Sequence, residues 1–437
     1  MTGANPPFDH CPEMTAPEIC PVPTKEQRRA FAVIAAVVFG LTFLKGFRLP
    51  NLWSATQFAF NYSQGFVRRG LIGEIARRIG GDEVFYYYHF VIYALIVLVL
   101  VAIFLGWAIR LALRADPSDL GFWMLILVCA ASPGMVMVVN TVGYYDHLGF
   151  LAVLLLVIWG PKLPGRYAIF YVVLALGLLF ALIHEALAVM FAPVMVFTLA
   201  CHIVARSKAE RLGIKNVVAL VTCLVLTASI VFVVSSIVST LGTEDFAKVR
   251  ALQLSIRRHT DFVNRPDAFE VLERSSRENL LHLMPEYWSY PANRRVAIKS
   301  AIAFAPSFAF LVYYGLRAVE RPTLSRAIRW ILRALFLGAV ISPLLLNFVG
   351  WDWNRWNGLS LVAGFCCVLA LKRYLPPFRP SPCPVHLWAL GAIAAVISLA
   401  STTVLFDAFQ VQFFPFEQQF EFIRNLFKHD FRYRPLG

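Results

Sequence analysis

The sequence predicts an all-α membrane protein that crosses the bilayer many times. Apolar runs of 18 or more residues, long enough to cross the hydrocarbon core as a helix, recur along the 437-residue chain. Only 15% of the residues are charged, whereas a soluble domain has about 25%. The mean hydropathy is +0.65. A soluble domain is therefore not expected.

Hydropathy divides the chain into a cytoplasmic tail (1–29), a transmembrane domain (30–405) and an external tail (406–437). The phenylalanines of the last part predict an amphipathic helix in the membrane interface. We expect about eleven spans, several of them short and therefore tilted or in a thinned bilayer. Their expected bounds are 30–48, 85–113, 120–139, 147–161, 167–184, 186–204, 216–240, 299–317, 330–349, 357–372 and 385–405.

The distribution of lysine and arginine predicts the orientation, because these residues collect in cytoplasmic loops. With a cytoplasmic N-terminus every inside loop is basic, and the short outside turns carry only Arg355. We therefore expect an external C-terminus and a multi-pass protein of the inner (plasma) membrane. The same rule accounts for the net charge of +14 without a nucleic-acid partner.

Two predicted external segments are long, 49–84 and 241–298. The first contains "GFVRRGLIGEI", whose arginines oppose the positive-inside trend, so topology does not account for them. Arginine forks bind phosphate oxygens bidentately, and nearby glycines let the backbone approach a ligand. We therefore expect Arg68 and Arg69 to bind phosphate, with Glu74 close by. Anionic lipid head groups are the alternative ligand.

Two further clusters contain acid–base residues. Tyr145, Asp146 and His147 precede a predicted span, and an Asp–His pair suits a general base, although Asp146 alone also suits a helix N-cap. His184 and Glu185 interrupt an apolar hairpin, where ionisable groups are costly and commonly functional. Capping of the turn, or pairing with an arginine, is the structural alternative.

The fourth cluster is "WDWNRWNGLS". Tryptophan faces stack on sugar rings, and an arginine among them can bind phosphate. An aromatic belt at the membrane surface with an Asp–Arg pair is the alternative. The predicted phosphate ligand is Arg355, and the predicted sugar contacts, together with Tyr145, are Trp351, Asp352, Trp353, Asn354 and Trp356.

All four clusters fall on the predicted outer face, which favours a single external site at membrane level. Its residue types suit a diphosphate and a sugar on a lipid whose tail stays in the bilayer. The geometric expectation is that Arg69 and Arg355 lie near one another. The sequence requires no cofactor, and the eight cysteines show no metal spacing. A divalent metal at Asp146 is left open.

The two long external loops, with "HEALAVMFAPVM" and "WDWNRWNGLSLV", make residues 30–405 similar to the GT-C superfamily of polyprenyl-phosphate-dependent membrane glycosyltransferases. The resemblance implies transfer of a sugar from a polyprenyl-linked donor to a glycan, lipid or protein acceptor, as in cell-envelope polysaccharide biosynthesis. Such enzymes carry a catalytic carboxylate early in the first external loop, but 49–72 contains no Asp or Glu. Wzy-type polysaccharide polymerases share the external arginines.

We therefore expect a glycosyltransferase, with a polymerase or ligase as the first alternative. Asp146 or Glu74 would be the base, with Glu185 as a further candidate and His147 or His184 assisting. A transporter or flippase of a lipid-linked or anionic solute is the second alternative, and it predicts charges at mid-membrane depth, where most spans have none. A non-catalytic assembly protein that binds partners through 241–298 is the third.

Overall fold

The computed structural model confirms an all-α protein. It describes residues 24–80, 84–117, 119–165, 168–207, 214–241, 246–274, 278, 281, 284–321, 323–350, 352–375, 385–404, 424 and 427. Within these ranges every regular element is a helix, and the only extended pairing is an isolated bridge between Phe85 and Thr260. The N-terminal tail before Thr24, most of the predicted amphipathic tail 406–437, and Trp351 lie outside the described residues.

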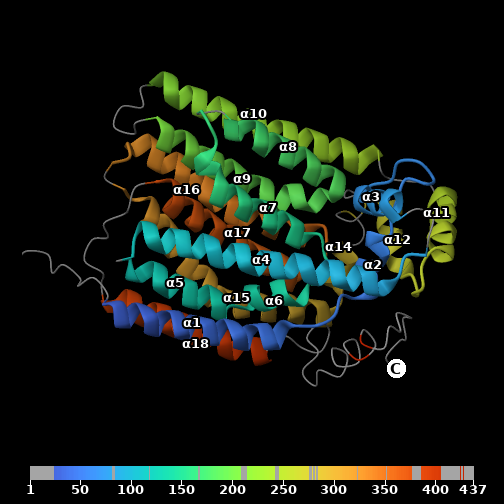
Figure 1. Ribbon diagram of the computed structural model, residues 1–437, viewed down its shortest axis with the longest axis horizontal. Helices are drawn as coiled ribbons and strands as arrows, with labels where there is room; N and C mark the ends of the chain where they lie inside the picture. Colours follow the sequence, from blue (N-terminus) through green and yellow to red (C-terminus); the bar gives the residue numbers. More distant parts are fainter. Residues whose placement is uncertain are drawn as a thin grey trace, which may run out of the picture.

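The long helices run side by side and form a bundle (Figure 1). The helices of the described chain are α1 (Lys25–Gly46), α2 (Leu52–Phe58), α3 (Leu71–Gly80), α4 (Tyr87–Ala115), α5 (Leu120–Ala131), α6 (Pro133–Asn140), α7 (Asp146–Trp159), η1 (Gly160–Lys162), α8 (Ala168–Ile183), α9 (Glu185–Arg206), α10 (Ile214–Leu241), α11 (Phe246–Arg258), α12 (Pro266–Glu273), α14 (Met284–Ser289), α15 (Pro291–Val319), α16 (Arg326–Ile341), η4 (Ser342–Phe348), α17 (Trp353–Tyr374) and α18 (Val385–Val404).

Several of these helices suit a membrane-embedded protein. In the described part of the chain, α1, α4, α9, α15 and the stretch Arg326–Phe348 are long and apolar enough to cross a bilayer. The bent pair α5–α6 makes a sixth candidate. A helix or bent pair occupies each range in which a span was predicted. Among the described residues searched, Ala168–Ile183, Leu224–Val238 and Ala389–Ala400 are apolar over only 10–17 residues. Eleven crossings and a cytoplasmic N-terminus therefore remain predictions.

The predicted span 120–139 is not one straight helix but bends by 50° between α5 and α6. Ser132 precedes Pro133, and the residue before a proline is pushed out of helical geometry. Ser132 adopts an extended backbone and its hydroxyl accepts a hydrogen bond from the Met135 N–H (3.3 Å). A new helix therefore starts at the break, with proline in its first turn.

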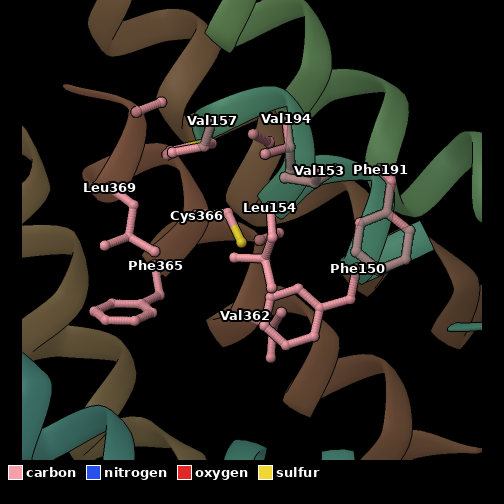
Figure 2. Close-up of a cluster of buried hydrophobic side chains, with 14 of the residues drawn as sticks. Phe150, Val153, Leu154, Val157, Phe191, Val194, Val362, Phe365, Cys366 and Leu369 are labelled. Carbon is pink, nitrogen blue, oxygen red and sulfur yellow. The ribbon is translucent and has the colours of Figure 1, made fainter. Parts of the chain in front are cut away.

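Helix α17 forms the centre of the bundle and packs against α6, α7, α9, α15 and α16. Figure 2 shows its Cys366 pointing toward Leu154 of α7, and Phe191 of α9 beside Phe150 of α7. A Cβ on Gly358 would lie 3.3 Å from the Cα of Gly134, so α6 and α17 pack closely there. The centre is therefore rigidly packed, and it fixes where the first turn of α17 points.

The short helices α2, α3, α11 and α12 gather at one end of the bundle (Figure 1) and are called the short-helix layer below. They come from the two long segments predicted to be external, and the two segments share a small core that includes Phe60, Val67, Leu252 and Phe269. The Phe85 N–H donates to the His259 carbonyl (2.7 Å), which joins the two segments again. The two predicted loops thus form one layer at the same end of the protein.

Gly73 allows α3 to pack onto this layer. A Cβ at this position would lie 2.0 Å from the carbonyl oxygen of Phe60 and 2.5 Å from that of Phe58. Only glycine permits such a close approach of two backbones. The sequence suggested this glycine for ligand contact, but it serves helix packing and is not among the cavity-lining residues described below.

Candidate functional site

A cavity of about 1800 Å³ lies where the short-helix layer meets the bundle. One part of this cavity is lined by charged side chains. The charged residues lining it include five arginines and five carboxylates, namely Arg68, Arg69, Arg265, Arg274, Arg355, Glu185, Asp267, Glu270, Glu278 and Asp352. Both Arg69 and Arg355 contribute, so two segments far apart in the sequence face one space, as expected.

The other part of the cavity is lined mostly by apolar side chains. It follows α9 from Glu185 to Val196, about 16 Å at 1.5 Å per residue. Residues of α9, α10, α16 and η4 form its walls, including Val189, Ala192, Val231, Phe232, Leu335, Ile341 and Leu345. Phe232 and Leu345 in this wall keep 72% and 53% of their surfaces exposed. Large apolar side chains are therefore accessible along this part of the cavity.

Arg69 and Glu185 form an ion pair in the ionic part. The Arg69 Nε lies 3.1 Å from both carboxylate oxygens of Glu185, and its Nη2 also donates to the carboxylate. Glu185 is the first residue of α9, where the helix dipole favours a negative charge. The side chains of Arg69 and Glu185 keep 12% and 16% of their surfaces exposed. The pair is therefore accessible from the cavity.

The backbone of Arg69 is strained, since its φ is +65° and no other non-glycine residue in the described ranges has a positive φ. Left-handed backbone of this kind is unfavourable for a side chain with a Cβ and is concentrated at functional sites. Here it directs the guanidinium to Glu185, while Gly70 follows directly in the sequence.

Arg68 has a different environment although it is the neighbouring residue. Its side chain is buried, and Nη2 donates to the carbonyl oxygens of Val271 and Arg274 at the end of α12. These carbonyls have no partner within the helix, so the arginine caps it. Arg68 thereby ties the first long segment to the second, and its Nη1 lies 3.9 Å from Glu185.

Arg355 is enclosed by partners. Its Nε and Nη2 donate to the two oxygens of Asp146 (2.6 and 2.8 Å), and Nη1 donates to Asp352 (3.1 Å). Its guanidinium lies 4.4 Å from the ring centres of Tyr144 and Trp356. Asp146 is buried beneath it and is not among the cavity-lining residues, whereas Asp352 is.

His184 lies beside Glu185 as the N-cap of α9. Its Nδ1 accepts a hydrogen bond from the Ala186 N–H (3.1 Å) and lies 3.7 Å from Glu185 Oε2. His184 lines the cavity. It therefore has both the capping role that the sequence offered as an alternative and access to the ionic part.

His147 and Tyr145 lie outside the cavity lining. The ring nitrogens of His147 contact the carbonyl oxygens of Val138 (2.7 Å) and Tyr144 (3.3 Å). The Tyr145 hydroxyl donates to the carbonyl of Gln57 (3.2 Å). Both side chains are buried and join α7 to its neighbours.

Glu74 also lies outside the cavity lining. It accepts hydrogen bonds from Arg77 (3.0 and 3.1 Å), from Arg78 (2.7 Å) and from the Tyr62 N–H (3.1 Å). The bonds from Arg77 and then Arg78 lower its pKa to about 2. Arg77 and Arg78 therefore bind a carboxylate of their own helix, α3, and Glu74 stays ionised.

The predicted sugar-contacting aromatics are divided by the fold. Trp356 lines the cavity, whereas Trp353 packs edge-on against Trp288 (4.9 Å between ring centres), and neither Trp353 nor Asn354 belongs to the lining. Trp53, which the sequence did not single out, stacks on Tyr144 (5.4 Å), and both rings line the cavity.

The sequence also missed the charged residues around α12. Asp267, Glu270 and Arg274 recur every three or four residues, which is the spacing of one helix face. That periodicity was the available signal, and it places these side chains together on the cavity wall. They add two negative charges and one positive charge to a site that had been predicted from other segments.

No three His, Cys, Asp or Glu side chains in the described part of the chain form a possible metal site. No family model matches the chain, and no similar curated protein or solved structure was found. The feature that bears on function is therefore the cavity itself, which is lined by charged residues in one part and by mostly apolar residues along α9, α10 and α16.

Proposed function

We propose that this protein is a membrane glycosyltransferase that moves a sugar from a polyprenyl phosphate or diphosphate to a hydroxyl acceptor at the outer face. The observation that supports this most is the two-part cavity. A phosphate and sugar need the ionic part, and a long hydrocarbon tail needs the apolar part between α9, α10 and α16. A water-soluble substrate would need only the ionic part.

The lining residues suit the chemistry of sugar transfer. An acceptor hydroxyl must lose its proton as the phosphate leaves the anomeric carbon. Glu185 and Asp352 line the cavity and can take that proton, and Arg69 can neutralise the leaving phosphate. The aromatic rings of Trp53, Tyr144 and Trp356 offer faces for sugar rings.

In this proposal Asp146 positions Arg355 rather than acting as the base. Both of its oxygens accept hydrogen bonds from that guanidinium, and it is buried beneath the cavity lining. Glu74 acts within α3 in a similar way, since Arg77 and Arg78 hold its carboxylate.

The test is binding and transfer by the purified protein in lipid nanodiscs. Polyprenyl phosphate is expected to bind, whereas polyprenol, which has the same tail without the charge, is expected to bind at least about tenfold more weakly, the effect of one charge-assisted pair. Equal binding of the two lipids would contradict the proposal. Movement of a lipid-linked sugar across the bilayer with no covalent change would favour a flippase.

In cells, a strain that depends on the gene for its surface glycan provides a second test. Arg69→Ala is expected to abolish the glycan, and Arg78→Ala is the matched control, because the Arg78 side chain is 76% exposed and lies outside the cavity lining. Full glycan with well-expressed Arg69→Ala protein would contradict the proposal.

A further inference from the structure

The cavity contains two arginine–carboxylate pairs that differ in how firmly they are held. Arg355 is surrounded by three carboxylate oxygens and two aromatic rings, and its side chain and that of Asp146 are almost completely buried. Among the described residues, the side-chain hydrogen bonds of Arg69 go to Glu185 alone, and that pair is open to the cavity.

A phosphate can replace the carboxylate on Arg69, because two phosphate oxygens present the same bidentate geometry to a guanidinium. Arg68 lies close enough to add a second positive charge, since its Nη1 is 3.9 Å from Glu185. Arg355 is less available, because an incoming phosphate would have to displace Asp146 from a buried pair.

Glu185 has a favourable place to remain ionised after such an exchange. It is the first residue of α9, at the positive end of the helix dipole. The carboxylate can therefore leave the guanidinium without leaving the cavity.

We infer that the phosphate of the lipid-linked ligand displaces Glu185 from Arg69, and that the released Glu185 carboxylate is the general base of the transfer. The inference rests on the proposed function. The acceptor hydroxyl gives its proton to Glu185, and its oxygen forms a bond to the anomeric carbon. The bond from that carbon to the phosphate oxygen breaks, and its electron pair stays on the phosphate that Arg69 holds.

This arrangement couples the base to the donor. Without a bound phosphate, Glu185 is neutralised by Arg69 and cannot readily accept a proton. Binding of the donor phosphate both occupies Arg69 and frees the base, so water entering the empty cavity meets no active carboxylate at this position.

The experiment measures the affinity of polyprenyl phosphate for purified variants in nanodiscs. Glu185→Gln removes the competitor for Arg69, so we expect about tenfold tighter binding, the scale of one charge-assisted pair, together with loss of transfer. Asp267→Asn is the matched control: it removes one negative charge from the same cavity lining, where Asp267 pairs with Arg265, but leaves Arg69 paired. We expect its affinity to change less than about threefold, since its effect is only the screened field of one charge.

Each outcome bears on one of the two claims. Unchanged or weaker binding by Glu185→Gln, or an equal rise in both variants, would overturn the exchange while leaving the proposed function in place. Failure of the native protein to prefer polyprenyl phosphate over polyprenol would overturn the proposed function itself. If Glu185→Gln does not fold, Glu185→Asp keeps the charge on a shorter side chain, and affinity equal to that of the native protein would overturn the exchange.

Discussion

Helix α17 carries an ionic cluster at each end, and the two clusters differ in access. Arg355, in the first turn, lies at the cavity with Asp146 and Asp352. Lys372, 17 residues later and about 26 Å along the axis, contacts Asp116 and Asp119. The Lys372 side chain is 1% exposed, and none of these three residues lines the cavity.

The cluster around Lys372 is buried, since the side chains of Lys372, Asp116 and Asp119 are at most 5% exposed. Lys372 Nζ lies 3.0 Å from Asp116 and also bonds Asp119, and the Tyr314 hydroxyl donates to Asp119 (2.6 Å). These contacts join α17 to α15 and to the residues between α4 and α5. The same residue types therefore stabilise the bundle at one end and are available to a ligand at the other.

The strongest test of this contrast is Lys372→Met. It removes the ammonium group that contacts both buried carboxylates, and breaking a buried pair in this way costs about 3–5 kcal/mol. We expect a lower free energy of unfolding in detergent, measured by denaturant titration. Adding Asp116→Asn and Asp119→Asn should recover much of the loss, because replacement of a whole buried pair is often neutral. No recovery would show that the lysine packs rather than neutralises.

At the cavity end the large effect should be on binding instead of folding. Arg69→Ala removes the proposed phosphate ligand, and we expect affinity for polyprenyl phosphate to fall about 100-fold, or about 2.7 kcal/mol. Stability should fall less than in Lys372→Met, because Glu185 still has Arg68 Nη1 at 3.9 Å and the N-terminus of α9 to stabilise its charge. The measurement is lipid binding in nanodiscs beside Arg78→Ala. A large loss of stability with unchanged affinity would assign Arg69 to the structural class of Lys372.

An intermediate effect is expected in the short-helix layer. Gly73→Ala places a Cβ 2.0 Å from the Phe60 carbonyl oxygen, and overpacking of this kind costs about 1–3 kcal/mol. Faster hydrogen exchange in α3 would report it. Gly80→Ala is the control, since a Cβ there meets nothing within 4 Å. Equal exchange in both variants would mean that the layer can shift to accept the methyl group.

Hydropathy and charge predicted the position of the helices and both long segments, because these depend on local composition. The partners of the charged residues could not be predicted in the same way. Asp146 binds Arg355, which is 209 positions away, and nothing local distinguishes that choice from solvent or ligand. Both residues had been assigned to the site separately, and only the fold shows that they neutralise each other.

Two features have a local signal in the sequence that the predictions did not include. They are the helix break at Ser132 and the charged face of α12. The Ser–Pro step is a known helix boundary. The spacing of Asp267, Glu270 and Arg274 is that of one helix face. The two-part cavity could not be predicted from local sequence patterns, because α9, α10 and α16 come together only through tertiary packing.

The smallest expected effect concerns pH. The pKa of Glu74 is about 2 against an ordinary 4.5, chiefly because Arg77 and Arg78 hydrogen-bond its carboxylate. Since the folded pKa is the lower one, Glu74 stabilises the protein fully above pH 4.5 and loses that contribution as the pH falls towards 2. The stability difference between the native protein and Glu74→Gln should therefore shrink over this window, measured by thermal unfolding in detergent. A difference that is constant with pH would show that the carboxylate's charge does not stabilise α3, and that the exposed arginines hold it no more firmly than water does.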